Sequence, residues 1–64
     1  MEVFIERSHT TMNLEFEGSV RELAEKIGVN IVEVLSVKNG EIVPEDEPVN
    51  NNDKISFLSV VSGG

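Results

Sequence analysis

Few residue types in this 64-residue chain could carry catalytic chemistry. His9 is the only histidine, and the chain contains no cysteine. A nucleophile needs a neighbouring base and a zinc site needs several nitrogen or sulfur ligands, so neither a catalytic triad nor a histidine-rich metal site can be assembled. We expect His9 to lie in a solvated turn with Thr10 and Thr11, and we assign no catalytic residue.

The acidic stretch PEDEP, residues 44–48, is a second candidate, because its carboxylates and Asp53 could bind a hard cation. It lacks the glycine and the alternating ligand spacing of a Ca²⁺ loop. We expect a solvated charge run in a surface crossover, since prolines are excluded from central strands. Contact with arginines of a partner is the alternative. No metal site is predicted, and no glycine-rich loop that would cradle the phosphates of ATP is present.

The third candidate is the end of the sequence, FLSVVSGG, residues 57–64. An apolar run that is typical of a strand gives way there to one serine and two glycines. Gly63 and Gly64 lack a Cβ and therefore allow another backbone to approach closely. We expect a function for these glycines; the alternative is a frayed terminus without one.

Composition limits the class of protein. Sixty-four residues make one small domain, near the lower size limit for a chain that folds alone. Twelve acidic and five basic residues give a formal charge of −7, which argues against binding of nucleic acid, because phosphates are neutralised by Lys and Arg. The acidity favours a partner with a basic docking face, or it only keeps the protein soluble.

Location follows from what the sequence lacks. No segment is long and apolar enough to span a bilayer, and the N-terminal MEVFIERSH is acidic and lacks the apolar core of a signal peptide. The absence of cysteine excludes a disulfide framework and fits a reducing compartment. We expect a cytoplasmic protein with no membrane partner.

The clearest element is a helix in GSVRELAEKIG, residues 18–28. Ser19 is a good N-cap, and Glu22 three residues later completes a capping box. Gly28 stands where a left-handed C-cap is needed. Four apolar residues have the i, i+3, i+4, i+7 spacing of one helix face: Val20, Leu23, Ala24 and Ile27.

Four to five strands are expected around this helix. Residues 2–8 and 12–17 should form an N-terminal hairpin, because the second segment alternates apolar and polar side chains. Asn39-Gly40 is a strong signal for a two-residue turn between two further strands. Residues 54–61 are expected as the last strand. The order β-β-α-β-β-β predicts an α+β fold, with one helix packed on one face of a mixed sheet.

The face that the helix leaves uncovered carries apolar side chains. If the odd-numbered residues of the last strand face the helix, Leu58 and Val60 point away from it. Simple alternation places Leu35 and Val37 on the helix side, whereas a bulge before the Asn-Gly turn would place them beside Leu58. We expect a docking patch on this face. The alternatives are scattered apolar residues or a homodimer interface.

Three features together resemble the β-grasp, ubiquitin-like sulfur-carrier proteins: VKNGEIVP (residues 37–44), NDKISFLSVVSGG (residues 52–64) and the capped helix between two hairpins. This family includes the small carriers of thiamine and molybdopterin synthesis (ThiS/MoaD-like) and the archaeal ubiquitin-like modifiers. The resemblance covers essentially the whole chain. It implies a β-grasp domain over residues 1–61 and a flexible tail over residues 62–64.

The resemblance also implies a chemistry. In the family, an E1-like adenylyltransferase uses ATP and Mg²⁺ to place AMP on the C-terminal carboxylate, here that of Gly64. A sulfur donor such as a cysteine desulfurase then displaces AMP and leaves a thiocarboxylate. An acceptor synthase takes the sulfur in thiamine or molybdopterin synthesis, or the sulfur is used in tRNA thiolation.

The chain would thus be a carrier and not an enzyme, and it would bind no cofactor itself. Gly63, Ser62 and Val61 would thread through the channel of the activating enzyme. The residues that dock on this enzyme would be the apolar set of the open face: Leu35, Val37, Leu58 and Val60. The alternatives are a ubiquitin-like modifier joined through Gly64 to lysines, and a β-grasp binding module without tail chemistry.

Overall fold

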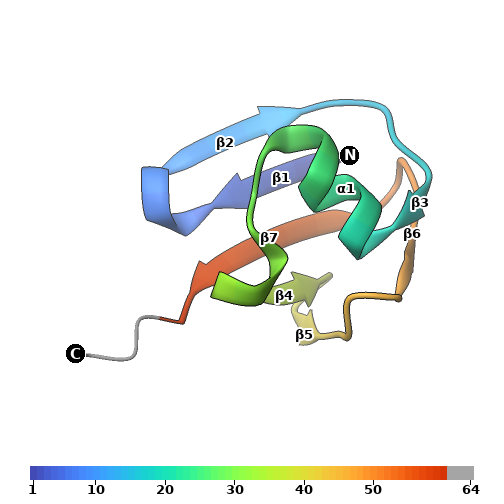
Figure 1. Ribbon diagram of the computed structural model, residues 1–64. Helices are drawn as coiled ribbons and strands as arrows, with labels where there is room; N and C mark the ends of the chain where they lie inside the picture. The colour runs from blue at the N-terminus through green and yellow to red at the C-terminus, as the bar shows by residue number, and fades with distance from the viewer. Residues whose placement is uncertain (61–64) are drawn as a thin grey trace.

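The computed structural model describes residues 1–60, in which one helix packs against one face of a mixed sheet (Figure 1). The helix α1 spans Val20–Ile27. The main sheet has the strand order β2-β1-β7-β4-β5. Its strands are β1 (Glu2–Ile5), β2 (Thr10–Asn13), β4 (Val34–Lys38), β5 (Glu41–Ile42) and β7 (Lys54–Ser59). The predicted α+β fold with one helix and a mixed sheet is confirmed.

Shorter elements join these strands. Two 3₁₀ helices, η1 (Glu6–Ser8) and η2 (Ile31–Glu33), precede β2 and β4. The strands β3 (Gly18–Ser19) and β6 (Pro48–Val49) pair with each other outside the main sheet. The plain crossover predicted for residues 44–48 is therefore wrong at its end. Pro48 begins a strand, but one in a two-stranded ribbon, where a missing N–H donor is tolerated.

The N-terminal hairpin forms with different bounds from those predicted. The turn is η1 followed by His9, whose φ of 52° is left-handed, so β2 already begins at Thr10. Its regular pairing ends at Asn13, because the chain then leaves the sheet towards the helix. Beyond the strand, Leu14 still exchanges hydrogen bonds with Met1 at 2.9 and 3.0 Å, and Phe16 N donates to the side chain of Asn51 at 2.6 Å.

The central strand of the sheet, β7, runs parallel to its neighbour β1. β1 pairs with β7 in parallel, whereas β1–β2, β4–β7 and β4–β5 are antiparallel. A parallel neighbour requires a crossover connection, and α1 lies within it. Val3 is opposite Ile55 and Ile5 is opposite Phe57, and these positions face the helix. The fully or nearly buried apolar side chains come from α1, β1, β6 and β7: Val3, Val20, Leu23, Ala24, Val49, Ile55 and Phe57.

The helix ends are capped as predicted. Glu22 N donates to Ser19 Oγ at 3.1 Å, and Ser19 N donates to Glu22 Oε1 at 2.9 Å, which is the reciprocal capping box. Gly28 closes the helix with a φ of 82°, a conformation that L side chains rarely adopt. An eight-residue helix is too short to be stable alone, so these caps and the buried stripe hold it in place.

The acidic stretch supplies backbone acceptors to the start of α1. Val20 N donates to the carbonyl of Glu47 at 3.0 Å, and Arg21 N donates to the carbonyl of Glu45 at 2.8 Å. With the capping box, the first N–H groups of the helix all have partners. In the part of the chain that the structure describes, no helix is long and apolar enough to cross a membrane.

Candidate functional site

The face of the sheet turned away from α1 carries Leu35 and Val37. Ser36 lies opposite Phe57 and is only 6% exposed, so Ser36 faces the helix and its two neighbours face the other way. Leu35 lies directly opposite Leu58. The register is continuous along β4, so this orientation arises without a bulge. The simple alternation that placed Leu35 and Val37 on the helix side is wrong.

Lys38 is a polar residue on the helix side of β4. It lies opposite the buried Ile55, at the edge of the core. Its Nζ donates to Glu47 Oε2 at 3.0 Å and to the Pro48 carbonyl at 2.9 Å. The hydrogen bond to the Glu47 carboxylate raises the pKa of Lys38 above its ordinary value, against a smaller opposing effect of desolvation. The aliphatic part of the Lys38 side chain therefore covers this end of the core, while its ammonium group is hydrogen-bonded.

The uncovered face has more apolar residues than the four that were predicted. Phe4 of β1 lies opposite Ser56, and Ile42 of β5 lies opposite Val37, so both share the side of Leu35 and Leu58. Ile42 is 69% exposed. The Asn-Gly turn contained the missing signal, because a two-residue turn pairs the residues on either side of it and so fixes the partner of Val37.

We call this surface the open face. It comprises four predicted docking residues and two that prediction missed: Phe4, Leu35, Val37, Ile42, Leu58 and Val60. Val60 follows Leu58 at the two-residue spacing that keeps side chains on one side of a strand, and it is 47% exposed.

The end of β7 is held from both sides. Ser59 N donates to Glu6 Oε1 at 2.8 Å, and Val60 N lies 3.4 Å from the carbonyl of Glu33. Arg7 Nη1 forms an ion pair with Glu33 Oε1 at 2.9 Å. The predicted threading residues Val61, Ser62 and Gly63, the predicted attachment site Gly64 and the domain boundary at residue 61 lie outside the described residues.

The acidic stretch is only partly the solvated run that was predicted. Glu45 forms an ion pair with Arg21, and their hydrogen bond raises the pKa of the Arg21 guanidinium. Glu47 is paired with Lys38, whereas Asp46 is exposed. Among residues 1–60, no three acidic or histidine side chains converge as they do in a cation site. His9 is exposed in its turn.

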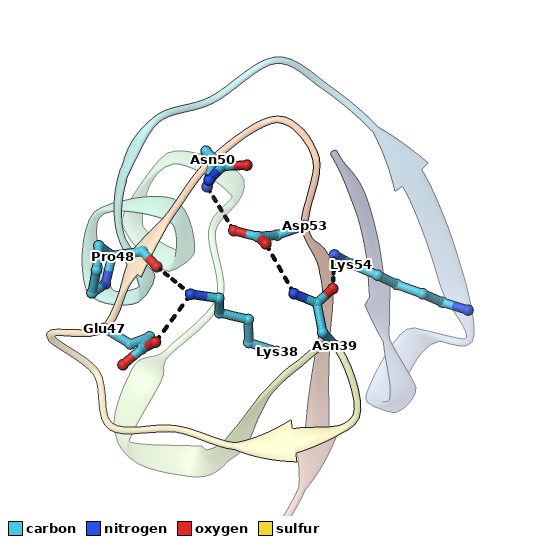
Figure 2. A network of polar contacts seen from close by, with 7 residues as sticks. All are labelled: Lys38, Asn39, Glu47, Pro48, Asn50, Asp53 and Lys54. Atoms are coloured by element: carbon cyan, nitrogen blue, oxygen red, sulfur yellow. Dashed lines mark hydrogen bonds and ion pairs between the residues drawn. The ribbon is translucent and has the colours of Figure 1, made fainter.

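Asp53 joins the Asn-Gly turn to the loop before β7 (Figure 2). Its Oδ1 accepts from Asn39 Nδ2 at 2.9 Å, and its Oδ2 accepts from Asn50 N at 2.8 Å. Two hydrogen bonds lower the pKa of Asp53 below its ordinary value of 3.8: the one from the Asn39 amide has the larger effect, and the one from Asn50 N–H the smaller. Lys54 N donates to Asn39 Oδ1 at 2.9 Å, and Asn39 N donates to the Lys54 carbonyl at 2.8 Å. Residues 37–44 and the segment that begins at residue 52, which both resemble the carrier family, are thus hydrogen-bonded to each other here.

A groove of about 270 Å³ lies between the C-terminal end of α1 and the strand ends near Ser59. Its lining combines the helix end with η1 and η2: Ile5, Arg7, Ser8, Ile27, Gly28, Val29, Asn30, Glu33 and Val34. Sites for small molecules usually enclose about 300–1,000 Å³ with converging polar groups.

The match to a known family decides the broad class. A profile of the ThiS family matches residues 5–64, which is nearly the whole chain. The chain belongs to the ThiS family. ThiS-family proteins are small carriers rather than enzymes, with a sulfur-carrier or ubiquitin-like role, and they generally work with E1-like activating enzymes and synthases. The open face and the held end of β7 are therefore the parts of this ThiS-family chain to examine for partner binding.

Proposed function

We propose that the chain is a sulfur carrier whose working group is the carboxylate of Gly64. A partner adenylyltransferase binds ATP and Mg²⁺, and the Gly64 carboxylate attacks the α-phosphorus with release of pyrophosphate. A sulfur donor such as a cysteine desulfurase then displaces AMP. If a persulfide donates the sulfur, the acyl disulfide that forms is cleaved by a second thiol, which becomes part of a new disulfide and leaves the thiocarboxylate. The thiocarboxylate then delivers sulfur to an acceptor in thiamine or molybdopterin synthesis or in tRNA thiolation. The single observation that carries the proposal is the family match, which extends to Gly64.

The open face supports a carrier that docks as a rigid body. Leu35 and Leu58 lie side by side on β4 and β7, Ile42 lies opposite Val37 on the same face, and Ile42 and Val60 are exposed. Contiguous exposed apolar surface of this kind marks interaction sites. Because these side chains stand on paired strands, docking on them would order little further backbone, which limits the entropy cost of binding.

The helix terminus supports assigning ATP to the partner. A free helix N-terminus is a common anion site, because its unpaired N–H groups point at the ligand. In α1, the N–H groups of Val20 and Arg21 are bound to carbonyls of residues 45–47, and that of Glu22 is bound to Ser19. This terminus has no donor left for a phosphate.

Adenylation can be tested directly. The chain is incubated with the activating enzyme of its own genome and ATP, and its intact mass is measured. We expect an adduct of one AMP on the full chain and none after deletion of Gly64. The deletion should change the free energy of unfolding by no more than about 0.5 kcal/mol, because the buried core lies between Val3 and Phe57. An unmodified full chain would contradict the proposal.

A ubiquitin-like modifier is the competing function, because the same adenylate could be attacked by a lysine amine. The ubiquitin-like character of the family is the observation that favours it. Mass spectrometry of cells separates the two. A carrier is recovered with sulfur in place of one terminal oxygen, whereas a modifier leaves Gly-Gly remnants on lysines of other proteins.

A further inference from the structure

The last hydrogen bond on the β1 side of β7 is made by a side chain. β1 and β7 pair in parallel as far as Ile5 and Phe57, and the chain then turns away from the sheet in η1. Glu6, the first residue of η1, places its Oε1 2.8 Å from Ser59 N. Its carboxylate accepts a hydrogen bond that a longer β1 would have accepted through its backbone. β7 thereby keeps a partner on this side after β1 has ended.

The other side of the strand end is held through Glu33. Val34 and Ser59 are the last paired residues of β4 and β7, and Val60 N lies 3.4 Å from the Glu33 carbonyl. Arg7, the neighbour of Glu6, binds the Glu33 side chain at 2.9 Å. Figure 1 shows the end of β7 between η1 and the segment that leads into β4. We call Glu6, Arg7 and Glu33 the exit clamp.

The two ties of the exit clamp differ in what they hold. The side chains of Arg7 and Glu33 are 75% and 52% exposed, and ion pairs with this exposure contribute little. The bond from Ser59 N to Glu6 Oε1 is exposed as well, but it holds the backbone of β7 directly, whereas the ion pair joins two side chains of η1 and η2. Glu6 is therefore the principal member of the clamp.

We propose that Glu6 is a positioning residue for the reaction at Gly64: it fixes Ser59 and Val60, the last described residues before the reactive end. This inference rests on the proposed function. Four extended residues span at most about 14 Å, so the place where Val60 is held limits where Gly64 can react. If Ser59 were released, the partner would have to order this residue as well, which would slow the reaction about 5- to 30-fold.

The first test uses the free, full-length protein and needs no partner. Backbone amide exchange of Ser59 is measured by NMR in the unmodified protein and in Glu6→Ala, Glu6→Gln and Glu17→Ala. Gln keeps an acceptor oxygen, and Glu17→Ala removes the same charge from an exposed loop residue directly before β3. We expect exchange at Ser59 to accelerate at least about 10-fold in Glu6→Ala alone, as for the loss of about 1.4 kcal/mol. Unchanged exchange in Glu6→Ala would overturn the inference.

A measurement on the unmodified protein keeps the inference testable if Glu6→Ala does not fold. A scalar coupling across the hydrogen bond, from Ser59 ¹⁵N to Glu6 ¹³Cδ, is expected. Its absence, together with rapid exchange at Ser59, would overturn the clamp without any variant.

The second test is the rate of adenylation by the activating enzyme. Because the open face is unchanged, Glu6→Ala should lower kcat about 5- to 30-fold with little change in KM, whereas Glu6→Gln and Glu17→Ala should react like the unmodified chain. An unchanged kcat despite faster exchange at Ser59 would overturn the positioning role. If the unmodified chain is not adenylated at all, the proposed function is wrong. The amide exchange of Ser59 still shows whether Glu6 holds the end of β7.

Discussion

The two ends of β7 are held in different ways. At its start, which we call the network end, Asn39, Asp53 and Lys38 each have at least two polar partners (Figure 2). At its finish, the tail end, Ser59 has one side-chain acceptor and Val60 has one long backbone contact. The ends are separated by the length of a six-residue strand, about 17 Å.

This difference suggests that the two ends of β7 serve different purposes: one stabilises the fold, and the other positions the chain for reaction with the partner. The network end ties the Asn-Gly turn, β6 and the last strand together, so loss of one member leaves several polar groups without partners. The tail end holds only the strand from which the tail departs. We expect changes at the network end to alter the free energy of unfolding, and changes at the tail end and on the adjoining open face to alter reaction with the partner.

Leu58→Asp should have the largest effect on the comparison. It introduces an unpaired charge into the proposed docking surface, which we expect to lower kcat/KM for adenylation about 100-fold, or about 3 kcal/mol. Asn52→Asp adds the same charge in an exposed loop at the network end and is the matched control. Equal rates for the two variants would show that the open face is not the docking surface.

Asp53→Ala tests the network end. It removes an acceptor of two hydrogen bonds, so the free energy of unfolding should fall by about 1–3 kcal/mol in urea denaturation, with adenylation of the folded protein unchanged. Asp46→Ala, an exposed carboxylate of the acidic stretch, should stay within about 0.5 kcal/mol. A loss of adenylation at unchanged stability in Asp53→Ala would reverse the roles of the two ends.

The pH dependence of stability tests the contribution of Asp53 at the network end. The pKa of Asp53 is lower in the folded protein than its ordinary value of 3.8, because the Asn39 amide and the Asn50 N–H bind the carboxylate. The stabilisation from this group is present above the unfolded pKa and is lost as the pH falls through the folded pKa. Thermal unfolding below about pH 4 should therefore depend less steeply on pH in Asp53→Asn than in the unmodified protein. Parallel curves would show that Asp53 contributes no proton linkage.

Arg7→Gln should have the smallest effect. Its ion pair with Glu33 is exposed, so we expect a change of about 0.5 kcal/mol or less in unfolding free energy and less than about a twofold change in adenylation rate. The pair should weaken further in high salt. A larger loss than in Glu6→Ala would make the ion pair, and not the carboxylate of Glu6, the main tie of the tail end.

The sequence determined the elements whose signals are local. The capping box of Ser19 and Glu22, the left-handed Gly28 and the Asn39-Gly40 turn each depend on residues within a few positions, and all three formed as predicted. The α+β class followed from their order, and the likeness to the carrier family was confirmed by the ThiS match. The docking, threading and attachment roles remain predictions.

Tertiary structure decided which way β4 faces and how the last strand is held. The side of Leu35 and Val37 depends on the register between β4 and β7, because a shift of one residue would reverse every side chain. Lys38 is accepted on the helix side only because residues 47 and 48 lie there to bind it. The bond from Ser59 to Glu6 joins residues 53 positions apart. Contacts across such separations arise when the parallel pair forms, and no local pattern encodes them.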